Sequence, residues 1–321
     1  MLDILLVTFP FFALVLCGYI AARRRMLPFD AISGLNTFVL YFALPSMLYR
    51  FGAGTPVAQL LDAAAIFVYL VCALVLVAFV VWSSRNARIG WNDASFGALV
   101  AAFPNTGFMG VPLLVALLGA PAAGPAILTI MIDLLITSSL CIALSRLDGA
   151  DEHGVQKAAK NAMRGMALNP MPWAIVLGGA ASALQLVPLP PVAQTIGLLA
   201  DSASPVALFT IGAVLARSQF VAAQEEHEPM PWGDFVPVAL IKLLVHPVLL
   251  WGAGRLAIAL GLPLGRFPLT VMVLVAALPS ASNVALLAER FGADTGRIAR
   301  IILLTTAAAF VTFSGAVALL R

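Results

Sequence analysis

The chain has 321 residues, of which 62% are hydrophobic and only 10% are charged. Soluble proteins have roughly 25% charged and about 45–50% apolar residues, so this composition, with a mean hydropathy of +1.02, excludes a water-soluble globular protein. The net charge of +3 comes from short basic clusters between apolar runs, which indicates membrane topology and excludes a nucleic-acid partner.

Ten apolar runs are each long enough for a transmembrane helix, which needs ~20 residues. The first run is too long for a signal peptide and is followed, not preceded, by basic residues. We therefore expect an all-α polytopic membrane protein without a second, soluble domain. The predicted spans cover residues 4–22, 33–51, 62–83, 94–118, 122–144, 168–187, 192–215, 235–259, 267–288 and 298–320.

The distribution of basic residues predicts the orientation of these spans. Thirteen Lys and Arg residues fall in the connections after odd-numbered spans, and four fall on the other side. Cytoplasmic loops are enriched in Lys and Arg, so we expect a protein of the inner (cell) membrane with both termini on the non-cytoplasmic side. Three widely spaced cysteines, each within an apolar run, favour neither a disulfide framework nor a metal site.

Prolines within the apolar runs indicate an internal repeat. Each removes a backbone hydrogen bond from its helix, and they occupy corresponding places, in spans two and seven and in spans four and nine. Two halves of five spans each, 1–144 and 168–321, must cross the membrane in opposite senses because five is odd. The sequence thus predicts two inverted repeats joined by a cytoplasmic linker, 145–167. We assign no role to the acidic run at 225–228 in a second loop.

Spans four and nine share a helix-breaking proline followed by small hydroxyl or amide residues. Non-helical backbone at membrane depth is tolerated only where protein or a water-filled cavity satisfies its polar groups, and exposed half-helix N-termini attract anions. Asn105 and Asn283 can each cap a half-helix and also bind a carboxylate. We therefore predict a substrate site where the two broken helices cross. Its predicted residues are Pro104, Asn105, Thr106, Gly107, Pro279, Ser280, Ser282 and Asn283, together with Lys242.

Five segments, in this order along the chain, resemble the bacterial branch of the auxin efflux carrier family. They are NTFVLYFALP (36–45), PNTGFMGVP (104–112), LNP (168–170), PVALFTIGA (205–213) and LPSASN (278–283). The resemblance implies ten spans, a scaffold domain, and a transport domain in which unwound helices four and nine cross. It also implies a small organic anion as substrate, as in carriers described as malonate or malate permeases, and a lysine of span eight beside the site. The loop between the halves is short, so auxin itself is not indicated.

Ionisable side chains within spans are functional candidates by default, because burying a charge in lipid is costly. Lys242 in span eight could offset the charge of an anion, or could extend its ammonium group to the interface. His246, one turn later, titrates near neutral pH when unperturbed. The candidate residues for a coupling ion are Asp133 in span five, Asp201 in span seven and His246, although each could instead be a buried structural partner.

The favoured function is a secondary carrier of malonate- or malate-like carboxylates that works by alternating access and is driven by a proton or sodium gradient. A sodium-coupled symporter of the bile-acid type is an alternative, although no carboxylate adjoins either predicted break. A channel is a further alternative. The intramembrane enzyme is disfavoured because His-Glu-x-x-His and Gly-x-Ser-x-Gly motifs are absent from the sequence. We expect no cofactor or metal; lipid is the surrounding partner, and a homodimer is left open.

Overall fold

The computed structural model describes residues 2–147, 170–224 and 230–320. The predicted linker 145–167 and the acidic run 225–228 therefore lie wholly or largely outside the described residues. The regular secondary structure of the described residues is helical, with one isolated β-bridge. It forms two compact units, and each is built from segments of both sequence halves. The predicted repeat boundaries, which follow the halves and not the units, stay a prediction.

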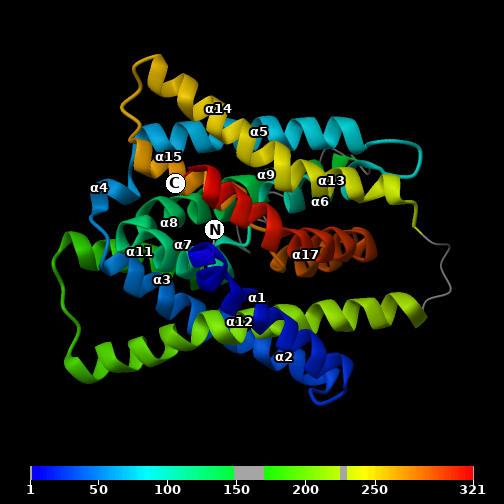
Figure 1. Ribbon diagram of the computed structural model, residues 1–321, viewed down its shortest axis with the longest axis horizontal. Coiled ribbons are helices and arrows are strands. Elements are labelled where there is room, and N and C mark those ends of the chain that lie inside the picture. Colours follow the sequence, from blue (N-terminus) through cyan, green and yellow to red (C-terminus); the bar gives the residue numbers. More distant parts are fainter. Residues whose placement is uncertain (1, 148–169, 225–229, 321) are drawn as a thin grey trace. The chain divides into compact units, whose positions relative to one another are not determined.

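Unit 1 comprises Met1–Asp62, Thr106–Leu128 and Asn169–Glu226. In it α1 packs across the long helix α12, and α3 packs on α11 (Figure 1). Its elements are α1 (Leu2–Arg23), α2 (Phe29–Phe38), η1 (Val39–Ala43), α3 (Leu44–Ala53), α4 (Val57–Leu60), η2 (Thr106–Gly110), α7 (Val111–Leu118), η3 (Ala120–Ala122), α11 (Pro170–Ala183) and α12 (Pro190–Gln224).

Unit 2 comprises Ala63–Asn105, Thr129–Leu168 and His227–Arg321. Helix α8 (Ala123–Ile132) runs across the division between the units. The other elements of unit 2 are α5 (Ala63–Ser84), α6 (Trp91–Ala102), η4 (Asp133–Thr137), α9 (Ser138–Leu144), η6 (Trp232–Asp234), α13 (Val236–Leu240), η7 (Ile241–Val245), α14 (His246–Ala259), α15 (Arg266–Ala276), α16 (Asn283–Arg290) and α17 (Thr295–Leu320).

Seven helices within the described residues are long and apolar enough to cross a membrane. They confirm a multi-pass, all-helical membrane protein. The other three predicted spans are not long continuous helices. Predicted spans four and nine are interrupted between α6 and η2 and between α15 and α16, and span six begins outside the described residues, which show only its α11 part.

Several intramembrane prolines are accommodated without breaking the helix. A proline ring clashes with the carbonyl four residues earlier, and a wider π-helical turn gives that carbonyl more room. Such turns, η1, η2 and η7, end two residues before Pro45, Pro112 and Pro247 respectively. Pro205 lies inside the continuous helix α12. Only Pro104 and Pro279 accompany a true interruption, so a proline in an apolar run did not by itself predict a break.

Glycines set the closest helix contacts of unit 1. A Cβ atom at Gly18 of α1 would collide with the carbonyl oxygen of Phe209 in α12, and one at Gly212 would collide with that of Val15. Close backbone approach through small residues is a common way for helices to associate in lipid, where the hydrophobic effect does not drive them together. The α1–α12 pair is therefore fixed by backbone contact.

Candidate functional site

The two helix interruptions of unit 2 meet and satisfy each other's backbone. Pro104 and Ser280 form an isolated antiparallel bridge. The N–H of Asn105 donates to the carbonyl of Pro279 at 2.8 Å, and the N–H of Ala281 donates to the carbonyl of Phe103 at 2.9 Å. Unwound backbone at membrane depth needs such partners, and here each break supplies them to the other.

A threonine that the sequence reasoning missed also contacts this junction. The N–H of Ser280 donates to Oγ1 of Thr305, at 3.3 Å, and Thr305 is buried in α17. The only signal in the sequence was the Thr305–Thr306 pair in an apolar run. Hydroxyls in such runs usually bond to their own helix, as Thr306 does to the carbonyl of Ile302, so this signal does not single out Thr305.

Two side-chain atoms at the junction have no partner within the part of the chain that the structure describes. They are Oγ of Ser280 and Oδ1 of Asn283, and both are buried. Asn283 is the first residue of α16, and the preceding Ser282 makes no side-chain cap for this helix. A buried polar atom without a hydrogen bond costs about 1–3 kcal/mol. The junction is therefore polar, preformed and incompletely satisfied.

Lys242 and His246 lie where the two half-helices end. The Nζ atom of Lys242, fully buried in η7, donates to the carbonyl of Ala276 at 2.8 Å and lies 3.1 Å from Nδ1 of His246. Ala276 is the last residue of α15, and the backbone of Ala101, near the end of α6, faces the His246 ring. A helix C-terminus carries partial negative charge, so the cation of Lys242 offsets that charge directly at α15.

Asp133 begins the π-helical turn η4 and is fully buried. The hydroxyl of Tyr69 donates to its Oδ2 at 2.8 Å, and the hydroxyl of Thr137 donates to its Oδ1 at 3.1 Å. The Tyr69 ring lies 6.5 Å from the His246 ring, centre to centre. Asp133 and Lys242 interact through their charges without a direct salt bridge. Five side chains from three segments of unit 2 thus form one buried polar group. The sequence reasoning missed Tyr69, because a tyrosine in an apolar helix carries no distinguishing signal.

Of the predicted residues, unit 2 contains Pro104, Asn105, Pro279, Ser280, Ser282 and Asn283 with Lys242, His246 and Asp133. Thr106 and Gly107 belong to η2 of unit 1. Asp201 is also in unit 1, where it forms an ion pair with Arg50 at 2.7 Å, and its side chain is 70% exposed. Asp201 thus belongs to a different unit from the buried group around Asp133.

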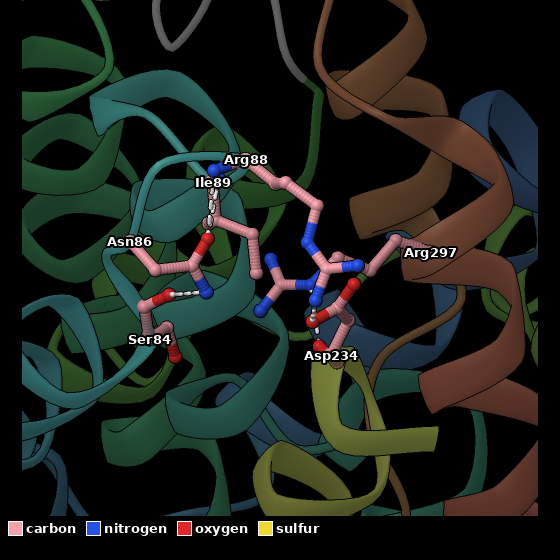
Figure 2. Close-up of polar contacts among 6 residues, drawn as sticks. All are labelled: Ser84, Asn86, Arg88, Ile89, Asp234 and Arg297. Carbon is pink, nitrogen blue, oxygen red and sulfur yellow. Dashed lines mark hydrogen bonds and ion pairs between the residues drawn. The ribbon is translucent and has the colours of Figure 1, made fainter. Parts of the chain in front are cut away.

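A second polar cluster lies at the start of α6, whereas the junction follows the end of this helix. The cluster joins the starts of α6 and α17 and the segment before α13. Arg297 in the first turn of α17 is 2% exposed, although the sequence pattern assigns it to a loop. Its Nε donates to the carbonyl of Asp234 and its Nη1 to that of Asp93, both at 2.7 Å. Figure 2 shows the side chains of Arg297 and Arg88 both reaching Asp234, whose carboxylate lies 3.4 Å from the Arg88 guanidinium. This cluster fixes the starts of α6 and α17 to the segment before α13.

A turn at Asn86 orients Arg88 toward this cluster. The Oδ1 atom of Asn86 accepts the N–H groups of Arg88 and Ile89, at 2.8 and 3.1 Å, and its amide reaches the carbonyl of Ser84 at 3.4 Å (Figure 2). Side-chain amides often replace backbone partners in this way in turns. The loop between α5 and α6 is therefore structured and carries Arg88 to Asp234.

Comparison with known proteins identifies the family. The family model described as "Membrane transport protein" matches residues 4–317. The chain belongs to the auxin efflux carrier family of membrane transport proteins. It is therefore a transporter and not an enzyme.

Individual members of the auxin efflux carrier family differ in how much they share with this chain. A "Putative malonate transporter" of Rhizobium meliloti is 31% identical over 97% of this chain and 94% of its own length. The "Uncharacterized transporter YfdV" of Escherichia coli K12 is 29% identical over 89% of this chain and 88% of its own. Auxin efflux carrier component 4 of Arabidopsis thaliana is 30% identical over 38% of this chain and 20% of its own.

Proposed function

We propose that this chain is a secondary active transporter of small carboxylates, of which malonate is the first to test, and that it works by alternating access. The observation that carries the proposal is the junction of two broken helices with the buried, unpartnered hydroxyl of Ser280 beside it. A carboxylate could accept hydrogen bonds from the amide groups of Asn105 and Asn283 and from the hydroxyl of Ser280. The malonate transporter named among its relatives supports this substrate class.

In this proposal Lys242 binds groups of the protein and influences the substrate only through its charge. Its ammonium group is already committed to the carbonyl of Ala276 and to His246. By offsetting the partial negative charge at the end of α15, it lowers the electrostatic cost of bringing an anion to the junction. This modifies the expectation that Lys242 is a direct ligand: we propose it as a positioning cation beside the site.

We further propose that Asp133 carries the coupling proton. It is fully buried, hydrogen-bonded by Tyr69 and within reach of the charge of Lys242. A carboxyl in such surroundings can exchange a proton when a conformational change alters its hydration. Asp201 is less suited to this role because it is exposed and paired with Arg50. Sodium remains the alternative coupling ion.

We also propose that the ten predicted segments all cross the membrane, as two inverted five-helix repeats with both termini on the non-cytoplasmic side. Seven long apolar helices and two interrupted ones with short apolar halves are in line with this count. Cysteines placed singly at the predicted loops and labelled from one side of the membrane test it. Labelling of Arg24→Cys and Arg85→Cys from opposite sides would contradict the proposed threading.

Uptake into proteoliposomes tests the transport proposal. Labelled malonate is supplied with an imposed proton gradient, with a sodium gradient, and with neither. Saturable uptake that is lost in Asn105→Ala and Ser280→Ala, but kept in the matched control Ser202→Ala of α12, supports the junction as the site. Ser202 bonds only to its own helix, at the carbonyl of Leu199. No gradient-dependent flux of malonate or malate by correctly folded protein would overturn the proposal.

A further inference from the structure

Arg25, two residues after the end of α1, has a backbone conformation that arginine rarely adopts. Its φ angle is 59°, which lies in the left-handed region. The N–H of Arg25 donates to the carbonyl of Ala22 at 3.1 Å, and the N–H of Met26 donates to that of Ala21 at 2.9 Å. These two bonds define a Schellman motif, whose left-handed residue is usually glycine. Backbone strain of this kind often marks a functional position.

The side chain of Arg25 lies beside two aromatic rings that contact each other. Its guanidinium carbon lies 4.5 Å from the ring centre of Phe29 in α2 and 4.4 Å from that of Phe220 in α12. The two rings meet edge to face, with centroids 5.4 Å apart. Stacking fixes the plane of a guanidinium group but does not use its N–H donors, which lie in that plane. The donors of Arg25 are therefore ordered and still available.

The neighbouring residues are basic or apolar. Arg23 donates to the hydroxyl of Tyr19 at 2.9 Å, and this hydroxyl donates to Gln219 of α12 at 2.6 Å. Among the residues that the structure describes, Arg24 and Arg25 form no ion pair with a carboxylate. Met26 is 78% exposed directly after them. The end of this apolar helix thus presents ordered positive charge next to exposed apolar surface.

We propose that Arg25, together with Arg24, binds the phosphate group of an anionic phospholipid at the membrane surface beside α1 and α12. Guanidinium groups bind phosphate with paired hydrogen bonds, and basic clusters at the end of a transmembrane helix attract anionic lipids. The position at the end of an apolar span and the exposed Met26 favour a lipid over free phosphate. The site lies within unit 1 and does not depend on the proposed transport function.

Titration of the purified, detergent-solubilised protein with a short-chain phosphatidylglycerol tests the proposal by calorimetry. Arg25→Gln is expected to raise the Kd about fivefold, which corresponds to the ~1 kcal/mol of one basic residue at an anionic surface. Arg85→Gln is the matched charge control, because Arg85 also stacks on an aromatic ring, with its guanidinium carbon 3.8 Å from the ring centre of Trp91. It is expected to leave the Kd unchanged.

Substitution by glycine separates lipid binding from folding. Gln185, two residues after the end of α11, has a φ angle of 53° in the same Schellman geometry. Gln185→Gly and Arg25→Gly should therefore both relieve strain and raise the melting temperature without lipid. Only Arg25→Gly should lose affinity for phosphatidylglycerol. A variant that is more stable but binds less lipid cannot be explained by misfolding.

Three results would overturn the proposal. The first is an unchanged Kd in both Arg25→Gln and Arg25→Gly. The second is equal affinity for a short-chain phosphatidylcholine, which would indicate contact with acyl chains only. The third is inorganic phosphate that binds as tightly as the lipid, which would assign the site to a free anion.

Discussion

The ammonium group of Lys242 lies 2.8 Å from the carbonyl oxygen of Ala276, at the residue where α15 ends and the interrupted backbone begins. The same group interacts with the charge of Asp133. One buried cation therefore connects the end of a half-helix to the only buried carboxylate within the described residues. The stability losses from substituting Lys242 and Asp133 are therefore not expected to add up.

Lys242→Met is expected to destabilise the protein by about 1–3 kcal/mol, because it leaves the buried carbonyl of Ala276 without its donor and removes the charge that interacts with Asp133. The double variant Lys242→Met with Asp133→Asn should lose less stability than the sum of the two single variants. Unfolding in mixed micelles measures all four proteins of this cycle. Additive losses would show that the two charges do not interact.

Asp133→Asn keeps the size of the side chain but removes its charge. If Asp133 carries the coupling proton, gradient-driven uptake should fall at least about tenfold while exchange of labelled for unlabelled substrate persists, since exchange needs no net proton movement. Asp201→Asn is the matched control and should retain gradient-driven uptake. Loss of coupling in Asp201→Asn alone would place the coupling group in unit 1.

Tyr69→Phe removes one hydrogen bond to Asp133 and leaves the ring packed beside His246. The expected loss of stability is about 1–2 kcal/mol. This value lies between those typical of hydrogen bonds between transmembrane helices and those typical of hydrogen bonds to charged groups. Thr137→Val removes the second hydroxyl bond to the same carboxylate. Because both act on one carboxylate, their combined effect should deviate from additivity; denaturant titration of the two single variants and the double variant measures this.

Gly97→Ala in α6 should destabilise unit 2. A Cβ atom there would lie 2.8 Å from Nη1 of Arg297, and this guanidinium cannot easily move because two carbonyls hold it. Overpacking of this kind costs about 1–3 kcal/mol. Gly252→Ala in α14 meets nothing within 4 Å and should instead stabilise its helix by up to ~1 kcal/mol.

Thermal unfolding compares the two glycine variants directly. The cost of Gly97→Ala should also shrink in an Arg297→Lys background, since lysine lacks the breadth of the guanidinium group. An equal cost in both backgrounds would mean that Arg297 is not the obstructing side chain.

The sequence anticipated much of the candidate site. Pro104 and Pro279, each followed by small polar residues, located both helix interruptions, because lipid offers no hydrogen bonds and such residues are otherwise avoided there. Lys242 and Asp133 were found for a similar reason: a charge within an apolar run is costly and therefore conspicuous. The structure then added that these two residues belong to one buried group.

Other features could not be read from the sequence. Tyr69, Thr305 and Arg297 are ordinary in type and local context, and they differ only in their partners, which lie far away in the chain. The accommodation of Pro45 and Pro247 by π-helical turns was likewise not predictable, because it depends on how the backbone of each helix relaxes around the ring.

The sequence by itself determined that this protein is an all-helical membrane protein, where its helices lie and where two of them are interrupted. These properties follow from local composition, since every backbone group in lipid must find a partner nearby. Only the tertiary structure decided that the two interruptions form hydrogen bonds with each other and that Lys242 donates to the last carbonyl of α15. It also decided that Asp133 and Asp201 lie in different units. Those relationships depend on which helices pack together, and packing is decided by side-chain shape and close backbone contact along the whole chain.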